Sequence, residues 1–177
     1  MPNCLSVVDE ESLTDPTADT AKVLVATERL LLEAARRSGF PAIILRVAAI
    51  YGPGRGYWFR QFLKNEARIE GDGGRVFNMI HRNDVIGTII AALEHGQGGE
   101  VYNAVDDEPV TQLAFYEWLA KKSGRELPPR VDEAETANRK RGLTNKRVSN
   151  RKLKTQLGYQ FRYPSFREGH AGMEFRL

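Results

Sequence analysis

The stretch that decides the fold is residues 42–56, Ala-Ile-Ile-Leu-Arg-Val-Ala-Ala-Ile-Tyr-Gly-Pro-Gly-Arg-Gly. Its apolar run is interrupted only by Arg46 and shows no polar alternation, which is typical of a strand covered on both faces in a parallel sheet. The run stops at Tyr51-Gly52-Pro53-Gly54, a turn in which backbone can approach a ligand. Open α/β sheets bind ligands where their strands end, so this exit is either a binding loop or an ordinary surface turn.

The residues before this strand predict a long helix over 21–38. Gly39 is placed to end that helix, and Arg36 and Arg37 suit its C-terminal dipole. A helix, a short loop and a buried strand make half of a β-α-β unit. Five residues are expected to share one face of the helix: Leu24, Thr27, Leu31, Ala34 and Ala35.

The remaining sequence alternates strand-like and helix-like segments, which predicts an α/β protein. Strands are expected at 76–80 and 100–105. Helices are expected at 57–68, at 111–122, at 132–141, at 151–157, and from Asn83 or Asp84 to Glu94. The expected N-terminal caps are Asn83 or Asp84, Thr111, and Ser149 or Asn150.

Length and composition narrow the class of protein. The chain has 177 residues, enough for one domain with a core, and a single cysteine, Cys4, which excludes an internal disulfide and fits a reducing compartment. No apolar run approaches the roughly 20 residues of a membrane span. The N-terminal residues lack the basic and apolar regions of a signal peptide. We therefore expect a cytoplasmic protein with no membrane association.

The charges are unevenly distributed although the net charge is only +3. Residues 9–19 hold five acidic and no basic side chains, whereas residues 139–162 hold nine Lys or Arg and no acid. A basic segment of this kind either meets the phosphate of a nucleotide or nucleic acid, or is an ordinary solvated face.

Three segments together resemble a known family. They are Leu45-Arg46 followed by Tyr51-Gly52-Pro53-Gly54, then Ile80-His81-Arg82-Asn83-Asp84-Val85, and then Val101-Tyr102-Asn103. In this order they resemble the C-terminal half of the extended short-chain dehydrogenase/reductase family, the NAD-dependent epimerase/dehydratases. The segment 153–159, Leu-Lys-Thr-Gln-Leu-Gly-Tyr, resembles the family's closing element. The resemblance covers about residues 8–168.

The resemblance implies a partial Rossmann-like parallel sheet, treated as one partial domain over 1–177, with a small α-rich substrate-binding subdomain at about 125–177. The family's glycine-rich cofactor turn belongs to a half that this sequence does not show. NAD or NADP is therefore the cofactor of the full-length family, and this chain alone is expected to bind none. Thr20 and Leu24 stand where the family has its catalytic Tyr and Lys, and Lys22 is two residues away from the Lys position. We accordingly assign no catalytic residue.

The resemblance also implies binding residues. The cofactor side is assigned to Arg46, Tyr51, Gly52 and Pro53. The substrate side is assigned to Arg55, His81 and Arg147. For His81 a structural hydrogen bond is favoured over a substrate contact, and for Asp84 a helix cap is favoured. Asn103 is expected to hold a neighbouring loop. Basic residues in the region that covers a nucleotide-sugar in the family are Arg141, Lys146, Arg147 and Arg151.

Two functions remain open at this point. One is an epimerase/dehydratase-like oxidoreductase acting on a nucleotide-sugar or related substrate, inactive as this truncated chain. The other is a non-catalytic binding protein that uses the basic C-terminal segment for a nucleotide, a nucleic acid or a partner chain. Nucleic acid is the less favoured ligand. Half of a doubly wound sheet exposes apolar surface, so we expect association with itself or with another chain.

Overall fold

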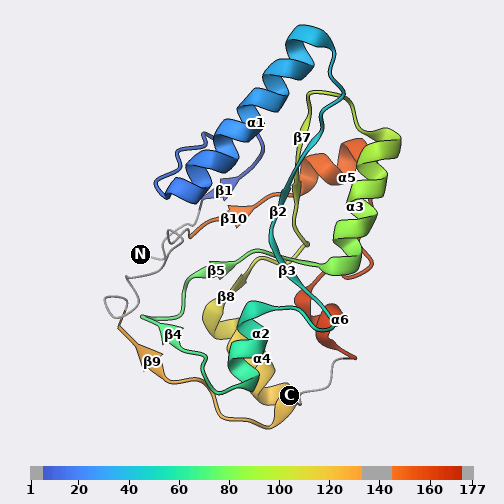
Figure 1. Cartoon of the computed structure of the whole chain (residues 1–177). Coiled ribbons are helices and arrows are strands. Elements are labelled where there is room, and N and C mark those ends of the chain that lie inside the picture. The colour runs from blue at the N-terminus through green and yellow to red at the C-terminus, as the bar shows by residue number, and fades with distance from the viewer. Residues whose placement is uncertain (1–5, 133–144, 173–177) are drawn as a thin grey trace.

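The structure is a computed structural model that describes residues 6–132 and 145–172. It is an α/β fold in which helices flank short strand pairs (Figure 1). The helices are α1 (Asp19–Ser38), α2 (Tyr57–Leu63), α3 (Arg82–His95), α4 (Gln112–Ser123), α5 (Arg151–Leu157) and α6 (Phe166–His170). The strands are β1 (Val7–Val8), β2 (Ile44–Val47), β3 (Ala49–Tyr51), β4 (Ile69–Glu70), β5 (Val76–Phe77), β6 (Met79–His81), β7 (Val101–Ala104), β8 (Val110–Thr111), β9 (Arg130–Val131) and β10 (Arg147–Val148).

Parallel pairing dominates the strands. The longest pair is β2–β7, in register from Ile44 opposite Val101 to Val47 opposite Ala104. The pairs β3–β6, β1–β10 and β4–β9 are also parallel, and β5–β8 is antiparallel. The predicted α/β class is thus confirmed. The pair β1–β10 brings residues near 147 back beside residues near 7.

The predicted single strand through residues 42–50 is wrong, since the chain changes partner at Ala48. The Ala48 amide donates to the Ala104 carbonyl (3.0 Å), whereas the Ala49 amide donates to the Asn78 carbonyl (3.2 Å). The stretch therefore forms β2 beside β7 and then β3 beside β6. The predicted strand 76–80 divides in the same way around Asn78. The side-chain amide of Asn78 donates to the Lys146 carbonyl, and its oxygen accepts from the Val148 amide, so this residue is held by the C-terminal segment.

Helix α1 ends as predicted. Gly39 has a φ of 68°, and its amide donates to the Ala35 carbonyl. The predicted inner face is partly wrong, because Leu24 and Thr27 are exposed while Ala21, Val25 and Glu28 turn partly inward. No residue of α1 is fully buried. Helix α1 therefore packs loosely against the sheet. One of its partly buried side chains, Glu28, is charged.

The buried residues form two clusters. The first lies among α2, α4, α6 and the short strands below the long strand pair (Figure 1). It is mostly aromatic, with Tyr51, Phe59, Phe77 and Phe115 at its centre. The second lies between β7, α3 and α5 and includes Ile80, Tyr102, Leu153 and Leu157. Residues 145–170 contribute to both clusters, so the C-terminal elements pack directly on the sheet.

The other helix predictions hold with shifted ends. Helix α2 ends at Leu63 rather than 68, and the chain turns at Asn65, which has a φ of 58°. Thr111 caps α4 as predicted, and its hydroxyl accepts from the Ala114 amide (3.2 Å). Helix α5 has the predicted bounds and ends at Gly158, although its N-cap Asn150 makes no side-chain capping bond. The predicted helix 132–141 lies outside the described residues beyond position 132.

Candidate functional site

A cleft of about 930 Å³ opens between α1 and β2, which lines it along its whole length, and Asn103 of β7 also lies in the lining. Residues 8–18 form its rim, and α1 contributes a wall that contains Ala21, Leu24 and Val25. The opposite side includes Arg75 and Lys146. The cleft therefore has an apolar wall facing basic side chains. Further lining residues with polar or aromatic groups are Asp9, Asp15, Trp58, Asn78 and Asn103.

Arg46, predicted to contact the cofactor, lines this cleft and is held by an acidic partner. Its Nε and one terminal nitrogen donate to the two carboxylate oxygens of Glu28 at 3.0 and 2.6 Å. The other terminal nitrogen donates to the Glu10 carbonyl at 3.2 Å. The pairing with Glu28 raises the pKa of the guanidinium. Arg46 thus fastens α1 and the N-terminal segment to β2, and its cofactor role stays a prediction.

The sequence reading did not identify Glu28 or Glu10 as part of this arrangement. A carboxylate oxygen of Glu10 accepts from the Asn103 amide at 2.7 Å, and the Asn103 side chain donates to the Ser149 carbonyl at 3.2 Å. Asn103 therefore holds a neighbouring loop, as predicted. The sequence does hold a signal for this pair. Glu28 is an acidic residue on the inner side of a predicted helix, and Arg46 is a basic residue within a predicted buried strand.

At the position where the resemblance implies the catalytic lysine, α1 presents Leu24 to the cleft. Leu24 lines the cleft and remains 72% exposed. Lys22 lies outside the cleft lining. Its side chain is 58% exposed and pairs with Asp19 at 3.0 Å. A leucine neither carries charge nor lowers the pKa of a neighbouring hydroxyl, so this wall supports packing against a ligand rather than proton transfer.

Tyr51, also predicted on the cofactor side, is buried in the aromatic cluster away from the cleft lining. Tyr51 is only 2% exposed, and its hydroxyl donates to the Ser165 carbonyl at 3.0 Å. Its ring stacks on His170 with 4.8 Å between centroids. Burial raises the pKa of Tyr51 and lowers that of His170 to about 4, so both rings are neutral near pH 7.

Gly52 and Pro53 form a tight loop with Arg55. The amides and carbonyls of Gly52 and Arg55 exchange hydrogen bonds of 3.1 and 2.9 Å. Gly52 has a φ of 140°, and a Cβ built on it would lie 2.9 Å from His81 Nε2 and 3.1 Å from the Arg82 side chain. The Pro53 carbonyl accepts from Arg82 at 2.8 Å. Protein side chains therefore occupy the space that a glycine leaves here, and the ligand roles of Gly52, Pro53 and Arg55 stay predictions.

His81 and Asp84 join β6, α3 and the C-terminal segment. His81 is the N-cap of α3, and its Nδ1 accepts from the Asn83 amide at 3.2 Å, which makes the predicted cap at Asn83 or Asp84 wrong. Asp84 is fully buried and accepts from the Tyr159 hydroxyl (2.8 Å) and from the amides of residues 162 and 163 (2.8 and 3.0 Å). Burial lowers the pKa of His81. Its expected structural hydrogen bond is present, and its substrate role stays a prediction.

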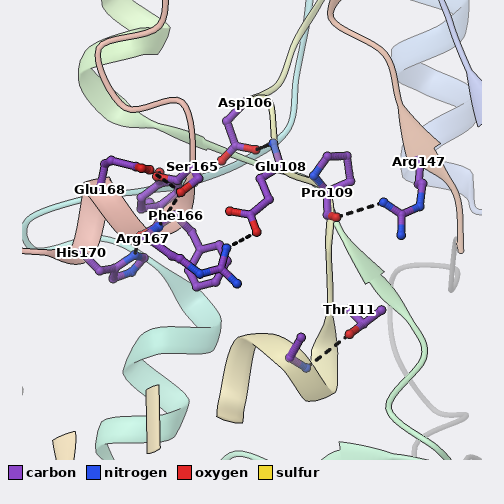
Figure 2. Close-up of polar contacts among 12 residues, drawn as sticks. Asp106, Glu108, Pro109, Thr111, Arg147, Ser165, Phe166, Arg167, Glu168 and His170 are labelled. Atoms are coloured by element: carbon purple, nitrogen blue, oxygen red, sulfur yellow. Dashed lines mark hydrogen bonds and ion pairs between the residues drawn. The ribbon is translucent and has the colours of Figure 1, made fainter. Parts of the chain in front are cut away.

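The basic C-terminal segment is partly neutralised by protein partners. Arg147 on β10 donates to the Pro109 carbonyl at 3.2 Å (Figure 2). Lys152 pairs with Glu100 at 2.7 Å and Lys154 with Asp107 at 2.9 Å. Arg141 lies outside the described residues, and Arg147 does not line the cleft. Of the basic C-terminal residues singled out by sequence and described by the structure, Lys146 is the one that lines the cleft.

Asp106, just after β7, is a buried carboxylic acid that the sequence reading did not mark. One of its oxygens accepts from the Glu108 amide at 3.2 Å, and the other has no hydrogen-bond partner among the described residues. Figure 2 shows this contact beside the ion pair between Glu108 and Arg167. Burial raises the pKa of Asp106 to about 8. Within residues 6–132 and 145–172, no group of three His, Cys, Asp or Glu could hold a metal ion.

The comparisons with known proteins agree with this architecture. The sequence model of the NAD dependent epimerase/dehydratase family matches residues 10–104, which is more than half of the chain. The chain belongs to this family.

Among the helices in the described ranges, none combines the length and apolar character needed to cross a membrane.

Two curated relatives are similar over most of this chain. Protein YeeZ of Escherichia coli (strain K12) is 28% identical over 159 residues, covering 89% of this chain and 53% of that protein. The 3-diazoavenalumate denitrifying reductase of a Streptomyces species is 29% identical over 164 residues, covering 86% and 52%. The chain thus spans about half the length of the curated relatives it matches.

Solved structures show the same fold. A functionally unknown conserved protein from Silicibacter pomeroyi superposes with a TM-score of 0.81 at 33% identity, covering 93% of this chain and 58% of that one. The dTDP-glucose 4,6-dehydratase DesIV from Streptomyces venezuelae, solved with NAD and TYD bound, gives a TM-score of 0.78 at 22% identity and covers 94% and 52%. The fold is therefore the Rossmann-like fold of epimerases and dehydratases, over part of its length.

Proposed function

We propose that this chain forms the substrate-side part of an NAD(P)-dependent epimerase/dehydratase-like oxidoreductase acting on a nucleotide-sugar or a related anionic substrate. The observation that carries the proposal is the cleft between α1 and β2, which includes Asn103 near the C-terminal end of β7. Open α/β sheets bind ligands beside the C-terminal ends of their strands. Arg75 and Lys146 place basic side chains in the lining, although Arg75 pairs with Glu70 at 3.3 Å and the lining also holds Asp9, Asp15 and Glu28. Arginine and lysine suit the phosphate groups of such a substrate by charge and by hydrogen-bond geometry.

The family membership and the named relatives support an oxidoreductase role. One curated relative is a reductase, and DesIV was solved with NAD. When bound, the dinucleotide of such enzymes supplies and accepts hydride. The residues of this chain would contribute the ligand-facing wall of α1 and the basic side of the cleft.

We further propose that the 177-residue chain by itself neither holds the dinucleotide tightly nor turns over substrate. Among the described residues, the glycine-rich turn that leads into a helix is 52–56, and there His81 and Arg82 fill the space beside Gly52. The α1 wall carries Leu24 in place of a base. A phosphate cradle and an acid-base pair would have to come from another polypeptide segment.

The alternative is a non-catalytic binding protein that uses the basic C-terminal segment for a nucleotide, a nucleic acid or a partner chain. Its support is the concentration of nine basic residues in 139–162. The pairing of Lys152 and Lys154 with acids reduces the charge left for nucleic acid. A nucleotide or a partner chain is the better fit to what remains.

The test is ligand titration of the 177-residue chain by calorimetry, using NADH, UDP-glucose and a single-stranded RNA as probes. We expect UDP-glucose to bind and Lys146→Ala to weaken that binding about tenfold. Lys122→Ala on the last turn of α4 is the matched control and should change nothing, since Lys122 is exposed and outside the cleft lining.

The outcomes separate the proposals. Absence of UDP-glucose binding, or equal affinity in the Lys146 variant, would contradict the substrate proposal. Micromolar NADH binding would contradict the proposal that this chain lacks the cofactor cradle. RNA binding that falls steeply with salt, without UDP-glucose binding, would favour the alternative.

A further inference from the structure

One end of the cleft combines an aromatic ring with a basic side chain. Among the described residues that line the cleft, Trp58 of α2 alone carries an aromatic side chain, and it remains partly exposed. Lys146, just before β10, lines the same cleft and is exposed. Sites for small molecules are typically lined by apolar and aromatic groups with a few well-placed polar ones. This end of the cleft has that composition.

The core holds the Trp58 ring in place. Its indole stacks on Phe77 with 3.8 Å between ring centroids and 8° between ring planes. Phe77 is only 1% exposed and lies edge-on to Phe115 and Tyr116. Phe77 therefore covers one face of the indole, and the opposite face or the ring edge borders the cleft. A ring that is fixed before binding loses little conformational freedom when a ligand packs on it.

The strand pair beneath Trp58 also holds the segment that carries Lys146. The side-chain amide of Asn78 donates to the Lys146 carbonyl at 2.9 Å. Asn78 follows Phe77 directly in the chain, and Phe77 is the residue on which Trp58 stacks. Asn78 itself lines the cleft. The indole and the lysine are thus attached to adjacent positions of the chain and belong to the same end of the cleft.

The cations of the lining differ in how far protein carboxylates already neutralise them. Arg46 is bonded to both carboxylate oxygens of Glu28. Arg75 is paired with Glu70 at 3.3 Å. Within residues 6–132 and 145–172, Lys146 has no acidic partner. One positive charge in the described lining is therefore left for a ligand.

We infer that this end of the cleft binds a planar aromatic ring that carries one carboxylate, with the ring against Trp58 and the carboxylate against Lys146. Stacked aromatic rings attract each other beyond the apolar area that they bury, and a lysine ammonium is a compact charge that pairs with a single carboxylate. A second negative charge would meet Asp9 and Asp15 in the same lining, which is unfavourable. This binding rests on the proposed function, in which the cleft is the substrate site, and it narrows the anionic substrate to aromatic carboxylates.

The experiment is calorimetric titration of the native 177-residue chain with three matched probes. trans-Cinnamate has the ring and the carboxylate, 3-cyclohexylpropionate keeps the charge and loses the planar ring, and cinnamyl alcohol keeps the ring and loses the charge. Probes of about eleven non-hydrogen atoms are expected to bind weakly, so the titration extends to about 10 mM. We expect cinnamate to bind at least about five times more tightly than either of the other two probes.

Substitutions test the two assigned contacts. Trp58→Leu should weaken cinnamate binding about tenfold, and Trp58→Phe, which keeps a ring, should weaken it less. The control is Tyr57→Leu, since Tyr57 is the adjacent aromatic residue of α2, is 67% exposed and lies outside the cleft lining. Lys146→Ala should also weaken cinnamate binding about tenfold, with Lys122→Ala as its control. Circular dichroism checks that each variant is folded.

Nuclear magnetic resonance of the native chain locates the ring without any substitution. Addition of cinnamate should shift the indole N–H resonance of Trp58. The same resonance of Trp118 should stay in place, because Trp118 packs on Phe166 and lies outside the cleft lining.

The outcomes separate this binding from the proposed function. Equal affinity for the planar and the saturated acid would overturn the inference, and so would an unchanged Trp58 resonance or an unchanged affinity in a folded Trp58→Leu variant. Cinnamate binding that is indifferent to Lys146→Ala would overturn the placement of the carboxylate. UDP-glucose binding that depends on Lys146, without cinnamate binding, would overturn the inference and leave the proposed function standing. Absence of binding by both ligands would contradict both.

Discussion

Glu28 on α1 and Arg46 on β2 form a two-point ion pair, with nitrogen–oxygen distances of 2.6 and 3.0 Å. The Glu28 side chain is only 16% exposed and that of Arg46 only 26%. Because α1 buries no residue completely, this pair is the most specific attachment between the helix and the sheet. The arginine that the sequence suggested for a cofactor thus has a structural task at the base of the cleft.

Removing one partner of this pair should loosen α1. We expect Glu28→Gln to lower the free energy of unfolding by about 2 kcal/mol, since it leaves a partly buried arginine without its charge partner. Urea denaturation measures this. The control is Glu33→Gln, which breaks the exposed 2.8 Å pair with Arg37 on the same helix and should cost under about 0.5 kcal/mol. Equal effects would show that Glu28 is no more than a surface charge.

Asp106 should make stability depend on pH. Its pKa is raised to about 8 by burial, whereas the same group in the unfolded chain titrates near 3.8. Below pH 4 both states are protonated. As the pH rises from 4 to 8 the unfolded chain releases this proton first, so the native state loses stability by up to about 1.4 kcal/mol per pH unit.

Asp106→Asn removes this titration and keeps an oxygen to accept from the Glu108 amide. The variant should gain about 4 kcal/mol relative to the native chain between pH 5 and pH 8.5. Thermal denaturation at the two pH values measures the difference. Parallel pH profiles for the two proteins would show that the folded-state pKa of Asp106 is not raised.

Asp84 should hold the C-terminal segment in place. It accepts three hydrogen bonds, from the Tyr159 hydroxyl and from two amides of the segment. Asp84→Ala should cost about 3 kcal/mol in the free energy of unfolding, because these donors lose their acceptor in a buried position. Tyr159→Phe should cost about 1 kcal/mol, and Tyr57→Phe, on a residue 67% exposed, should be neutral. A neutral Asp84→Ala would show that these three hydrogen bonds do not hold the C-terminal segment in place.

The two glycines of the loop after β3 should respond differently to alanine. Gly52 has a φ of 140° and no room for a Cβ, whereas Gly54 has a φ of 74° and open space around it. Gly52→Ala should cost at least about 3 kcal/mol, and Gly54→Ala about 1 kcal/mol from backbone strain alone. Chemical denaturation of both variants measures the contrast. Similar costs would indicate that the loop rearranges to admit the side chain.

Local signals in the sequence were sufficient for much of the fold. Gly39, Gly124 and Gly158 end helices in the left-handed conformation, as expected for residues without a Cβ. Thr111 caps α4 because its hydroxyl is one residue before the helix begins. These features depend on neighbours within about four positions, and such short-range effects are readable from sequence. The order of motifs also sufficed to indicate the family.

Partners distant in sequence were decided by tertiary structure alone. The division of the strand at Ala48 follows from β7 ending beside β2 while β6 begins beside β3. No local pattern around Ala48 encodes that exchange. The α3 cap is His81 rather than Asn83 or Asp84 for the same reason. Asp84 accepts hydrogen bonds from Tyr159 and its neighbours, some 75 positions away.

The sequence by itself determined the α/β class, the glycine-marked ends of α1, α4 and α5, and the family, because these rest on short-range backbone preferences and on the order of motifs. Only the tertiary structure decided which groups face the cleft. Arg46 is on the cleft through its pair with Glu28, whereas Tyr51 is withdrawn into the aromatic cluster by Ser165 and His170. The physical reason is that a side chain's role depends on the partners that packing brings to it, and those partners come from segments far away in the chain.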